Sequence, residues 1–216
     1  MNEKFFDLKK EKQDRMINAA LKVFALNGYR HASTDDIVRE AAISKGLLFH
    51  YFENKLGVYA FVYDYSVRYL LLELSTAVDA KETDLFTLMQ QVETGKMHAM
   101  CGYPYLQPFL NRAQAENVNE ALVAVEERKQ QMEEAYENIY ARADLGKYAA
   151  AEDVVKLRKM MELTIKGLMN ERILEDAFQP EMLYEEILEY LQLSRRLAER
   201  SGQLSLIHIS EPTRPE

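Results

Sequence analysis

The sequence contains few of the residues that interrupt regular structure or cross-link a chain. It has only 8 glycines and 5 prolines in 216 residues, which leaves long unbroken stretches and favours helices. A single cysteine, Cys101, excludes an internal disulfide framework and is typical of a reducing compartment, so we expect a cytoplasmic protein. No apolar run approaches the roughly 18 residues that span a bilayer. The charged stretch 1–12 lacks the pattern of a signal peptide, and we expect no membrane partner.

The charge is unevenly distributed along the chain. The net charge is −8, which by itself argues against a nucleic-acid partner. Residues 1–60, however, hold 10 Lys and Arg against 8 Asp and Glu, whereas the remaining 156 residues hold 17 against 27. The first quarter of the chain is therefore the part able to approach phosphate groups, although the signal is weak in isolation.

Apolar residues recur at three- and four-residue spacings along most of the chain, as in amphipathic helices. No stretch alternates like a strand, and no internal repeat is present. Ser33, Ser44 and Asn54 are suited to cap helices that follow them, and Pro180 stands at a tolerated first helical position. We therefore expect an all-α fold of about nine helices. The ranges with a helical pattern are 10–27, 33–41, 44–52, 55–78, 83–100, 119–143, 150–173 and a last helix that begins at 179–180.

The stretch 33–55 has the spacing of a helix-turn-helix. Two short helices are joined by 41–43, a link of the length typical of this motif. The outward face of the second helix combines lysine, glycine, apolar and aromatic side chains, which is unusual for a helix that only meets water. Lysine and hydroxyl groups contact DNA phosphates, and Leu47 is suited to a thymine methyl group. The inward side chains are expected to be Ile37, Val38, Ala41, Ile43, Leu48 and Phe52.

This stretch resembles the signature of the tetracycline-repressor (TetR) family, roughly T-x-x-I-A-x-x-A-G-V-S-x-G-x-L-Y-x-Y-F-x-x-K. Residues 20–29 also match the family pattern A-x-x-x-F-x-x-x-G-[YF], whereas the rest of the chain resembles the family only in helix number and length. The resemblance implies a DNA-binding homodimer, most often a repressor released from a palindromic operator by a small-molecule effector. The matching signature residues are Thr34, Ile37, Ala41, Ser44, Gly46, Leu48, Tyr51, Phe52 and Lys55.

Two departures from the family pattern matter for binding. Ala42 occupies the glycine position of the turn, where alanine costs up to ~1 kcal/mol if a positive φ is required. Phe49 replaces a common tyrosine and so lacks a hydroxyl that would bind phosphate, a contact worth roughly 1 kcal/mol. We expect the turn and the binding mode to survive both changes.

The resemblance assigns DNA contacts to both helices of the motif. Thr34 and Tyr51 would bind phosphate, and Lys45, Gly46 and Leu47 would contact bases. Because Tyr51 and Lys55 are expected to face outward, alanine at either position should weaken DNA binding and leave the fold intact. The complete predicted contact set is Ser33, Thr34, Ser44, Lys45, Gly46, Leu47, Phe49, His50, Tyr51 and Lys55.

The remainder of the chain is expected to sense the effector and to form the dimer. The apolar stripes of 154–173 and 182–197 are rich enough to supply half of a four-helix bundle with a second copy. The resemblance places an effector pocket among the fourth to seventh helices, although such side chains more often fill a core. The candidate lining residues are Phe61, Tyr65, Phe86, Met89, Met97, Met100, Tyr103, Tyr105 and Phe109.

We expect no cofactor, no metal and no enzyme activity. His98 and Cys101 stand at i and i+3 but have no third ligand nearby in the sequence. No phosphate-binding glycine loop, nucleophile motif or acid cluster is present. The alternative is a helical interaction or ligand-binding protein of the same fold that does not bind DNA. It remains open because the N-terminal charge excess is small.

The predicted organisation has three parts. Residues 1–54 form a helix-turn-helix domain, and residues 55–203 form an effector-binding and dimerisation domain. Residues 204–216 (LSLIHISEPTRPE) lack the helical pattern and resemble translated vector sequence, so we expect no functional residue among them.

Overall fold

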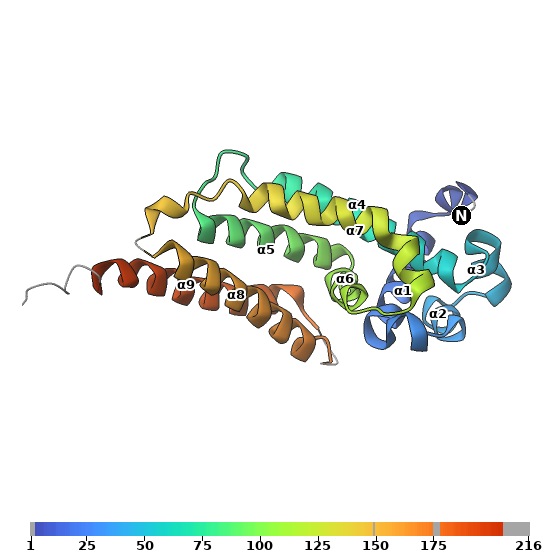
Figure 1. Cartoon of the computed structure of the whole chain (residues 1–216). Helices are drawn as coiled ribbons and strands as arrows, with labels where there is room; N and C mark the ends of the chain where they lie inside the picture. Colours follow the sequence, from blue (N-terminus) through green and yellow to red (C-terminus); the bar gives the residue numbers. More distant parts are fainter. Residues whose placement is uncertain (1–2, 149, 175–177, 205–216) are drawn as a thin grey trace, which may run out of the picture.

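A computed structural model describes residues 3–148, 150–174 and 178–204, and these residues form α-helices and two short 3₁₀ helices without a strand (Figure 1). The all-α prediction is confirmed. The elements are η1 (Glu3–Asp7), α1 (Lys10–His31), α2 (Thr34–Ala41), α3 (Lys45–Phe52), α4 (Lys55–Ala77), α5 (Leu85–Gly102), α6 (Leu106–Gln114), α7 (Asn119–Tyr140), η2 (Leu145–Lys147), α8 (Ala151–Arg172) and α9 (Pro180–Leu204).

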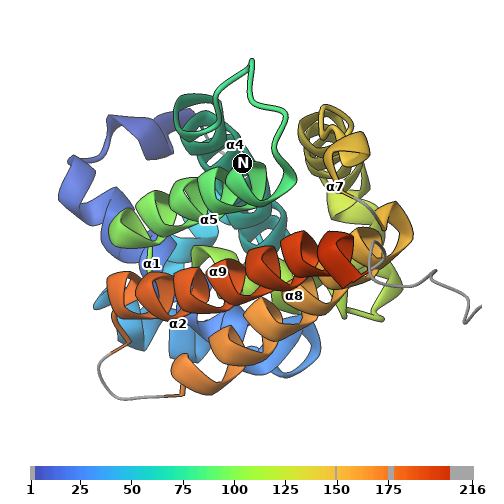
Figure 2. The same cartoon turned by 90° about the vertical axis from the view of Figure 1, so that its left-hand side faces the viewer.

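The helices form a small and a large group. In Figure 1, α1, α2 and α3 gather at one end, and α4 leads away from them into the larger group. There α4 packs against α5 and α7, and α5 also packs against α9. Helices α8 and α9 pack against each other along one side of the molecule (Figure 2). Helix α6 joins the two groups, because it packs against α1 and also contacts α5 and α8.

Most predicted helix ends agree with the structure to within a few residues. The side chains of Ser33, Ser44 and Asn54 accept hydrogen bonds from backbone N–H groups at the starts of α2, α3 and α4. Gly28 interrupts α1 with a positive φ of 67°, close to the predicted end, although helical structure resumes and continues to His31. These caps pair backbone donors that a helix start leaves without a partner.

Helix α6 was not predicted, because prolines 104 and 108 looked like helix breakers. Pro108 is the third residue of α6, within the first turn, where a backbone N–H has no partner inside the helix. The proline therefore costs α6 no internal hydrogen bond. This short helix supplies the buried residues Leu106, Phe109 and Leu110 to the junction between the two groups.

The predicted boundary at 203–204 falls within α9, which continues to Leu204. Residues 205–216, the rest of the predicted tail, lie outside the described residues. None of the described helices is long and apolar enough to cross a membrane.

Candidate nucleic-acid interface and internal cavity

The turn between α2 and α3 has the backbone geometry of a helix-turn-helix. Ala42 adopts the left-handed conformation with φ 52° and ψ 50°. Its N–H donates to the carbonyl oxygen of Arg39 at 3.2 Å, and the N–H of Ile43 donates to Val38 at 3.0 Å. The positive φ expected at this position is therefore present. Alanine adopts it here at a steric cost that glycine would not have.

Helix α3 presents the predicted mixed face to the outside. Lys45, Gly46 and His50 are exposed, and Leu47 and Phe49 are half-buried. A Cβ built on Gly46 would meet no atom within 4 Å, so this part of the helix surface is open to a close partner. Leu48 and Phe52 point into the core, as predicted. The face has the shape and composition of a helix that enters the major groove.

Tyr51 does not face outward, contrary to the sequence analysis. It is only 7% exposed, and its ring packs edge-on against Phe5 at 5.6 Å between centroids. Phe5 belongs to η1, is fully buried and also contacts Phe52 and Phe61. The N-terminal segment thus covers the side of α3 on which Tyr51 lies. Because Phe5 is far from Tyr51 in sequence, helical periodicity alone gave no sign of this contact.

Lys55 also has a structural environment that the sequence analysis missed. Its Nζ donates to the carbonyl oxygens of Tyr29 at 2.9 Å and Ala32 at 3.3 Å, near the end of α1. The same ammonium group lies 4.4 Å from the centre of the Tyr29 ring. Lys55 therefore joins the start of α4 to the end of α1, where carbonyl groups lack partners within the helix.

The other predicted contact residues lie at the starts of α2 and α3. Ser33 and Ser44 use their side-chain oxygens as caps, which leaves each hydroxyl hydrogen able to donate. Thr34 is half-buried at the first position of α2. Lys45 forms an ion pair of 2.8 Å with Asp35, and both side chains are exposed. A phosphate or base contact by Lys45, as the resemblance predicts, would have to replace this carboxylate.

A strained joint separates α3 from α4. Glu53 has a φ of 65° and a ψ of −51°, and the N–H of Asn54 donates to the Phe52 carbonyl oxygen across it at 2.7 Å. This is a γ-turn with a positive φ, a rare and strained conformation. A Cβ at Gly57 would collide with the same Phe52 carbonyl oxygen, so only glycine fits there. The joint fixes where α3 stands relative to α4.

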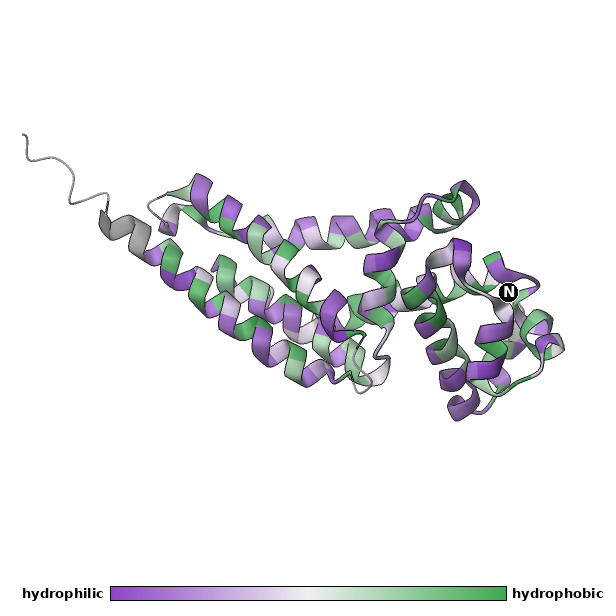
Figure 3. Ribbon diagram, turned by 90° about the horizontal axis from the view of Figure 1, so that it is seen from below, coloured by the Kyte–Doolittle hydropathy of each residue, from purple (hydrophilic) through white to green (hydrophobic). Residues whose placement is uncertain are grey.

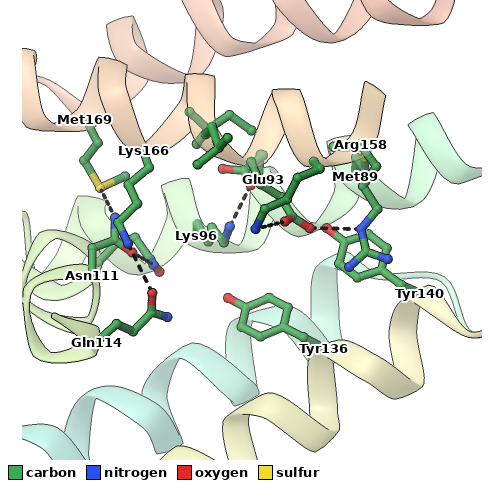
Figure 4. Close-up of a pocket in the computed structure, with 15 residues that line it drawn as sticks. Met89, Glu93, Lys96, Asn111, Gln114, Tyr136, Tyr140, Arg158, Lys166 and Met169 are labelled. Atoms are coloured by element: carbon green, nitrogen blue, oxygen red, sulfur yellow. Dashed lines mark hydrogen bonds and ion pairs between the residues drawn. The ribbon is translucent and has the colours of Figure 1, made fainter. Parts of the chain in front are cut away.

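A cavity of about 320 Å³ lies among α5, α6, α7 and α8 (Figure 4). Of the nine residues predicted to line a pocket, only Met89 borders it, and Tyr105 borders a separate groove beside α1. Most of the others fill the cores: Phe61, Phe86, Met100, Tyr103 and Phe109 are buried, and Tyr65 and Met97 are half-buried. Residue type alone did not separate core from cavity wall.

The cavity wall is more polar than predicted. The buried pair Lys96–Glu93, with 2.7 Å between Nζ and Oε1, lies on α5. Tyr136 and Tyr140 of α7 lie opposite, and the guanidinium of Arg158 stands 4.1 Å from the Tyr140 ring centre. The complete lining is Met89, Glu93, Lys96, Gln107, Asn111, Gln114, Tyr136, Tyr140, Arg158, Lys159, Glu162, Leu163, Ile165, Lys166 and Met169.

Two opposing effects set the charge of Lys96. Burial is the largest single effect and acts to lower its pKa, but the adjacent Glu93 carboxylate together with Tyr136 and Tyr140 outweighs burial, so the pKa of Lys96 lies above its ordinary value. Burial raises the pKa of the Tyr136 and Tyr140 hydroxyls. The cavity therefore contains a permanent cation beside neutral phenols at physiological pH.

His98 and Cys101 each lie near a carboxylate from another helix. His98 Nδ1 lies 3.9 Å from Glu73, and Cys101 Sγ donates to Glu181 at 3.2 Å. Burial and this carboxylate raise the pKa of the Cys101 thiol to about 11. Among the described residues, no group of three potential ligands has metal-binding geometry.

Comparisons with known proteins agree with this geometry. Residues 16–60 match the family model for bacterial regulatory proteins of the tetR family. The chain is 36% identical over 78 residues, 34% of its length, to the uncharacterized HTH-type transcriptional regulator YuxN of Bacillus subtilis. It is 41% identical over 49 residues, 23% of its length, to the regulator TtgW of Pseudomonas putida. These matches span 26% and 37% of the two curated relatives.

Solved structures share the fold over nearly the whole chain. A TetR family transcriptional regulator from Chloroflexus aurantiacus superposes with a TM-score of 0.55 at 22% identity, covering 94% of this chain and 95% of that one. A putative tetR family regulator from Shewanella sp. PV-4 gives 0.53 at 16% identity, covering 89% and 98%. With the turn at Ala42 and the open face of α3, these matches show that residues 16–60 form a DNA-binding module of the tetR family type and that the chain has the fold of solved TetR family regulators.

Proposed function

We propose that this protein is a transcriptional regulator that binds a palindromic DNA operator through α3 and acts in the cytoplasm. The observation that carries the proposal is the open outer face of α3, with Lys45, Gly46 and Leu47 at its start and no neighbouring atom in front of Gly46. The proposed module is residues 1–54, and 55–203 form the sensing and dimerisation part. The protein acts as a repressor while bound to the operator, and a small-molecule effector releases it, as is usual in the family.

A fluorescence-anisotropy titration tests DNA binding. The labelled duplex comes from the region upstream of the protein's own gene, and a scrambled duplex serves as control, each at two salt concentrations. We expect tighter binding to the native duplex and a steep loss of affinity with salt, because bound lysines release counterions from phosphates. A folded dimer that binds neither duplex at low salt contradicts the proposal for this operator and favours the interaction-protein alternative.

We propose that α8 and α9 pair with their copies in a second chain. Both helices expose large apolar side chains, with Met160 and Met182 60% and 61% exposed and Leu193 46% exposed. Figure 2 shows these helices side by side, and Figure 3 shows hydrophobic and hydrophilic positions interspersed along the helix that leads into the grey C-terminal trace. Apolar surface of this kind supports self-association through a two-fold interface. A dimer would also present two α3 helices to successive major grooves.

Analytical ultracentrifugation of Leu193→Glu tests the interface. The charged side chain would be buried between two copies, so we expect a monomer at concentrations where the unaltered protein is a dimer. Leu72→Glu is the control, because Leu72 is 61% exposed on α4, away from α8 and α9. Unchanged sedimentation of Leu193→Glu would place the dimer interface elsewhere.

Helix α6 connects the cavity directly to the DNA-binding module, and α4 connects it through α5 and α7. Helix α6 borders the cavity through Gln107 and Asn111, and it packs against α1. At that contact, Glu116, just after α6, accepts a hydrogen bond from the Tyr29 N–H at 2.9 Å. Helix α4 continues from α3 through the strained joint at Glu53. An effector that binds better when α6 or α4 is displaced would shift the population toward a form that fits DNA poorly.

A further inference from the structure

The cavity contains hydrogen-bonding groups that nothing in the described residues satisfies. The hydroxyl of Tyr136 and the Oε1 of Gln107 are both buried and have no partner. Gln107 is itself only 6% exposed, and its amide nitrogen donates to Asn111 at 2.9 Å. Buried polar groups in native proteins are normally paired, so these two groups at one cavity are available to a polar ligand.

A cation lies beside these groups, the Lys96 ammonium, whose side chain is 17% exposed. Lys96 has one hydrogen bond, to Glu93, although an ammonium group has three donors. Its Nζ lies 5.5 Å from the centre of the Tyr136 ring, so the remaining donors and the Tyr136 hydroxyl border the same space (Figure 4). A carboxylate accepts from several donors at once and is the natural partner of such a set.

The charge of the whole wall also favours an anion. The lining includes four cationic side chains, Lys96, Arg158, Lys159 and Lys166, against the two carboxylates Glu93 and Glu162. Arg158 and Lys159 both pair with Glu162, at 2.9 and 3.6 Å. Within the described part of the chain, Lys166 makes one long hydrogen bond of 3.5 Å, to Gln114. The excess of two positive charges is therefore not neutralised within the cavity wall.

The remaining wall is apolar and aromatic. The rings of Tyr136 and Tyr140 and the side chains of Met89, Ile165 and Met169 line the space between the charged groups. Methionine and aromatic side chains fit flat apolar bodies of varied shape. A volume of about 320 Å³ is at the small end of ligand pockets, which limits the ligand to one or two rings or a short chain.

We propose that the cavity binds a small organic carboxylate with a flat apolar body. The carboxylate accepts hydrogen bonds from Lys96 Nζ and Tyr136 Oη, and a hydroxyl or N–H substituent on the body donates to Gln107 Oε1. That this ligand is the effector rests on the proposed function. Binding of the ligand to the cavity does not require DNA and can be measured separately.

Isothermal titration calorimetry of the full chain with three probes of one shape tests the inference. The probes are 1-naphthoate, its neutral amide 1-naphthamide, and the cation 1-naphthylmethylammonium. We expect 1-naphthoate to bind at least tenfold more tightly than the amide. Tyr136→Phe, which removes only the hydroxyl, should weaken 1-naphthoate about tenfold and leave the amide nearly unchanged.

A second variant guards against misfolding by keeping the charge of the pair balanced. Lys96→Met combined with Glu93→Gln removes the cation without leaving an unpaired buried carboxylate, and it should abolish the preference for 1-naphthoate. Lys156→Gln on the exposed side of α8 is the matched control and should bind as the unaltered protein does.

Three results would overturn the inference: equal affinity for acid and amide, preference for the ammonium probe, or no binding of any probe at millimolar concentration. The anisotropy titration is read separately. Failure of the probes with intact operator binding rejects the carboxylate and leaves the regulator standing. Binding of 1-naphthoate without operator binding supports the carboxylate site and contradicts the proposed regulator.

Discussion

The ammonium nitrogen of Lys55 lies 4.4 Å from the centre of the Tyr29 ring and 2.9 Å from the Tyr29 carbonyl oxygen. One side chain of α4 thereby holds the end of α1, where carbonyl groups would otherwise lack protein partners. We predict that Lys55→Met lowers the stability of the folded protein by about 1–3 kcal/mol, because hydrogen bonds to a charged group and a cation–π contact are lost together. The midpoint of thermal unfolding at fixed protein concentration measures the effect.

The control is Lys81→Met, which removes an exposed lysine from the segment between α4 and α5. It should leave the midpoint unchanged. If Lys55→Met also left the midpoint unchanged but weakened DNA binding, the lysine would act mainly as a phosphate contact, as the sequence analysis expected. A decrease in both the unfolding midpoint and the DNA affinity would mean that Lys55 supports DNA binding by holding α4 against the end of α1.

A substitution at Ala42 is expected to stabilise the protein. It holds the left-handed conformation at the end of α2, with φ 52°, and its side chain is exposed. We predict that Ala42→Gly stabilises the protein by up to ~1 kcal/mol, because glycine adopts this conformation without the steric penalty of a Cβ. Urea denaturation followed by circular dichroism measures the gain, and DNA affinity should not change.

Ala41→Gly is the matched control for that experiment. Ala41 is the preceding residue, fully buried and within α2. Glycine there loses packing and adds backbone freedom to the unfolded chain, so it should destabilise by roughly 1 kcal/mol. Stabilisation by both substitutions, or by neither, would contradict the role assigned to the turn.

The sequence was sufficient for the features that depend on local spacing. The caps at Ser33, Ser44 and Asn54 and the positive φ at Ala42 follow from rules that span a few residues. The burial of Tyr51 does not, because it depends on Phe5 in a segment far away in sequence. Helix periodicity places a side chain on a face but does not say which distant segment covers that face.

The cavity was missed for a related reason. The prediction selected aromatic and methionine side chains, and most of these fill cores where packing favours them. The polar wall is assembled from Lys96 on α5, Gln107 on α6, Tyr136 on α7 and Arg158 on α8. Each of these residues is unremarkable in its own helix. Only the packing of four helices brings them together, and the residue pattern of a single helix does not predict which residues of other helices will line the same cavity.

Tyr51 now requires two substitutions to separate structure from DNA contact. Tyr51→Ala removes a buried ring that packs against Phe5, so we predict a loss of about 3 kcal/mol in stability. Tyr51→Phe keeps the ring and should leave the unfolding midpoint nearly unchanged. If the hydroxyl binds phosphate, Tyr51→Phe should weaken operator binding about fivefold in the anisotropy titration, as expected for one neutral hydrogen bond. Equal affinity of Tyr51→Phe and the unaltered protein would assign the residue to the core alone.

Because Asp35 forms an ion pair with Lys45, we predict that removal of the Asp35 charge increases DNA affinity. Both side chains are exposed and the pair spans 2.8 Å, so it contributes little to stability but keeps a carboxylate beside the lysine expected to contact DNA. Asp35→Asn should free Lys45 and remove a charge that repels phosphate. We predict operator binding a few-fold tighter at low salt, with a smaller gain at high salt because ions screen the repulsion. Lys45→Gln should weaken binding.

Asp153→Asn is the matched control for that experiment, because Asp153 is an exposed aspartate in the first turn of α8 that also pairs with a lysine, at 3.2 Å. Since α8 lies away from α3, its substitution should change neither DNA affinity nor its dependence on salt. An unchanged or weaker affinity of Asp35→Asn, with Asp153→Asn neutral, would mean that the carboxylate holds Lys45 in a useful position. The ion pair would then be part of the binding surface, because a fixed lysine loses less side-chain entropy on contact with DNA.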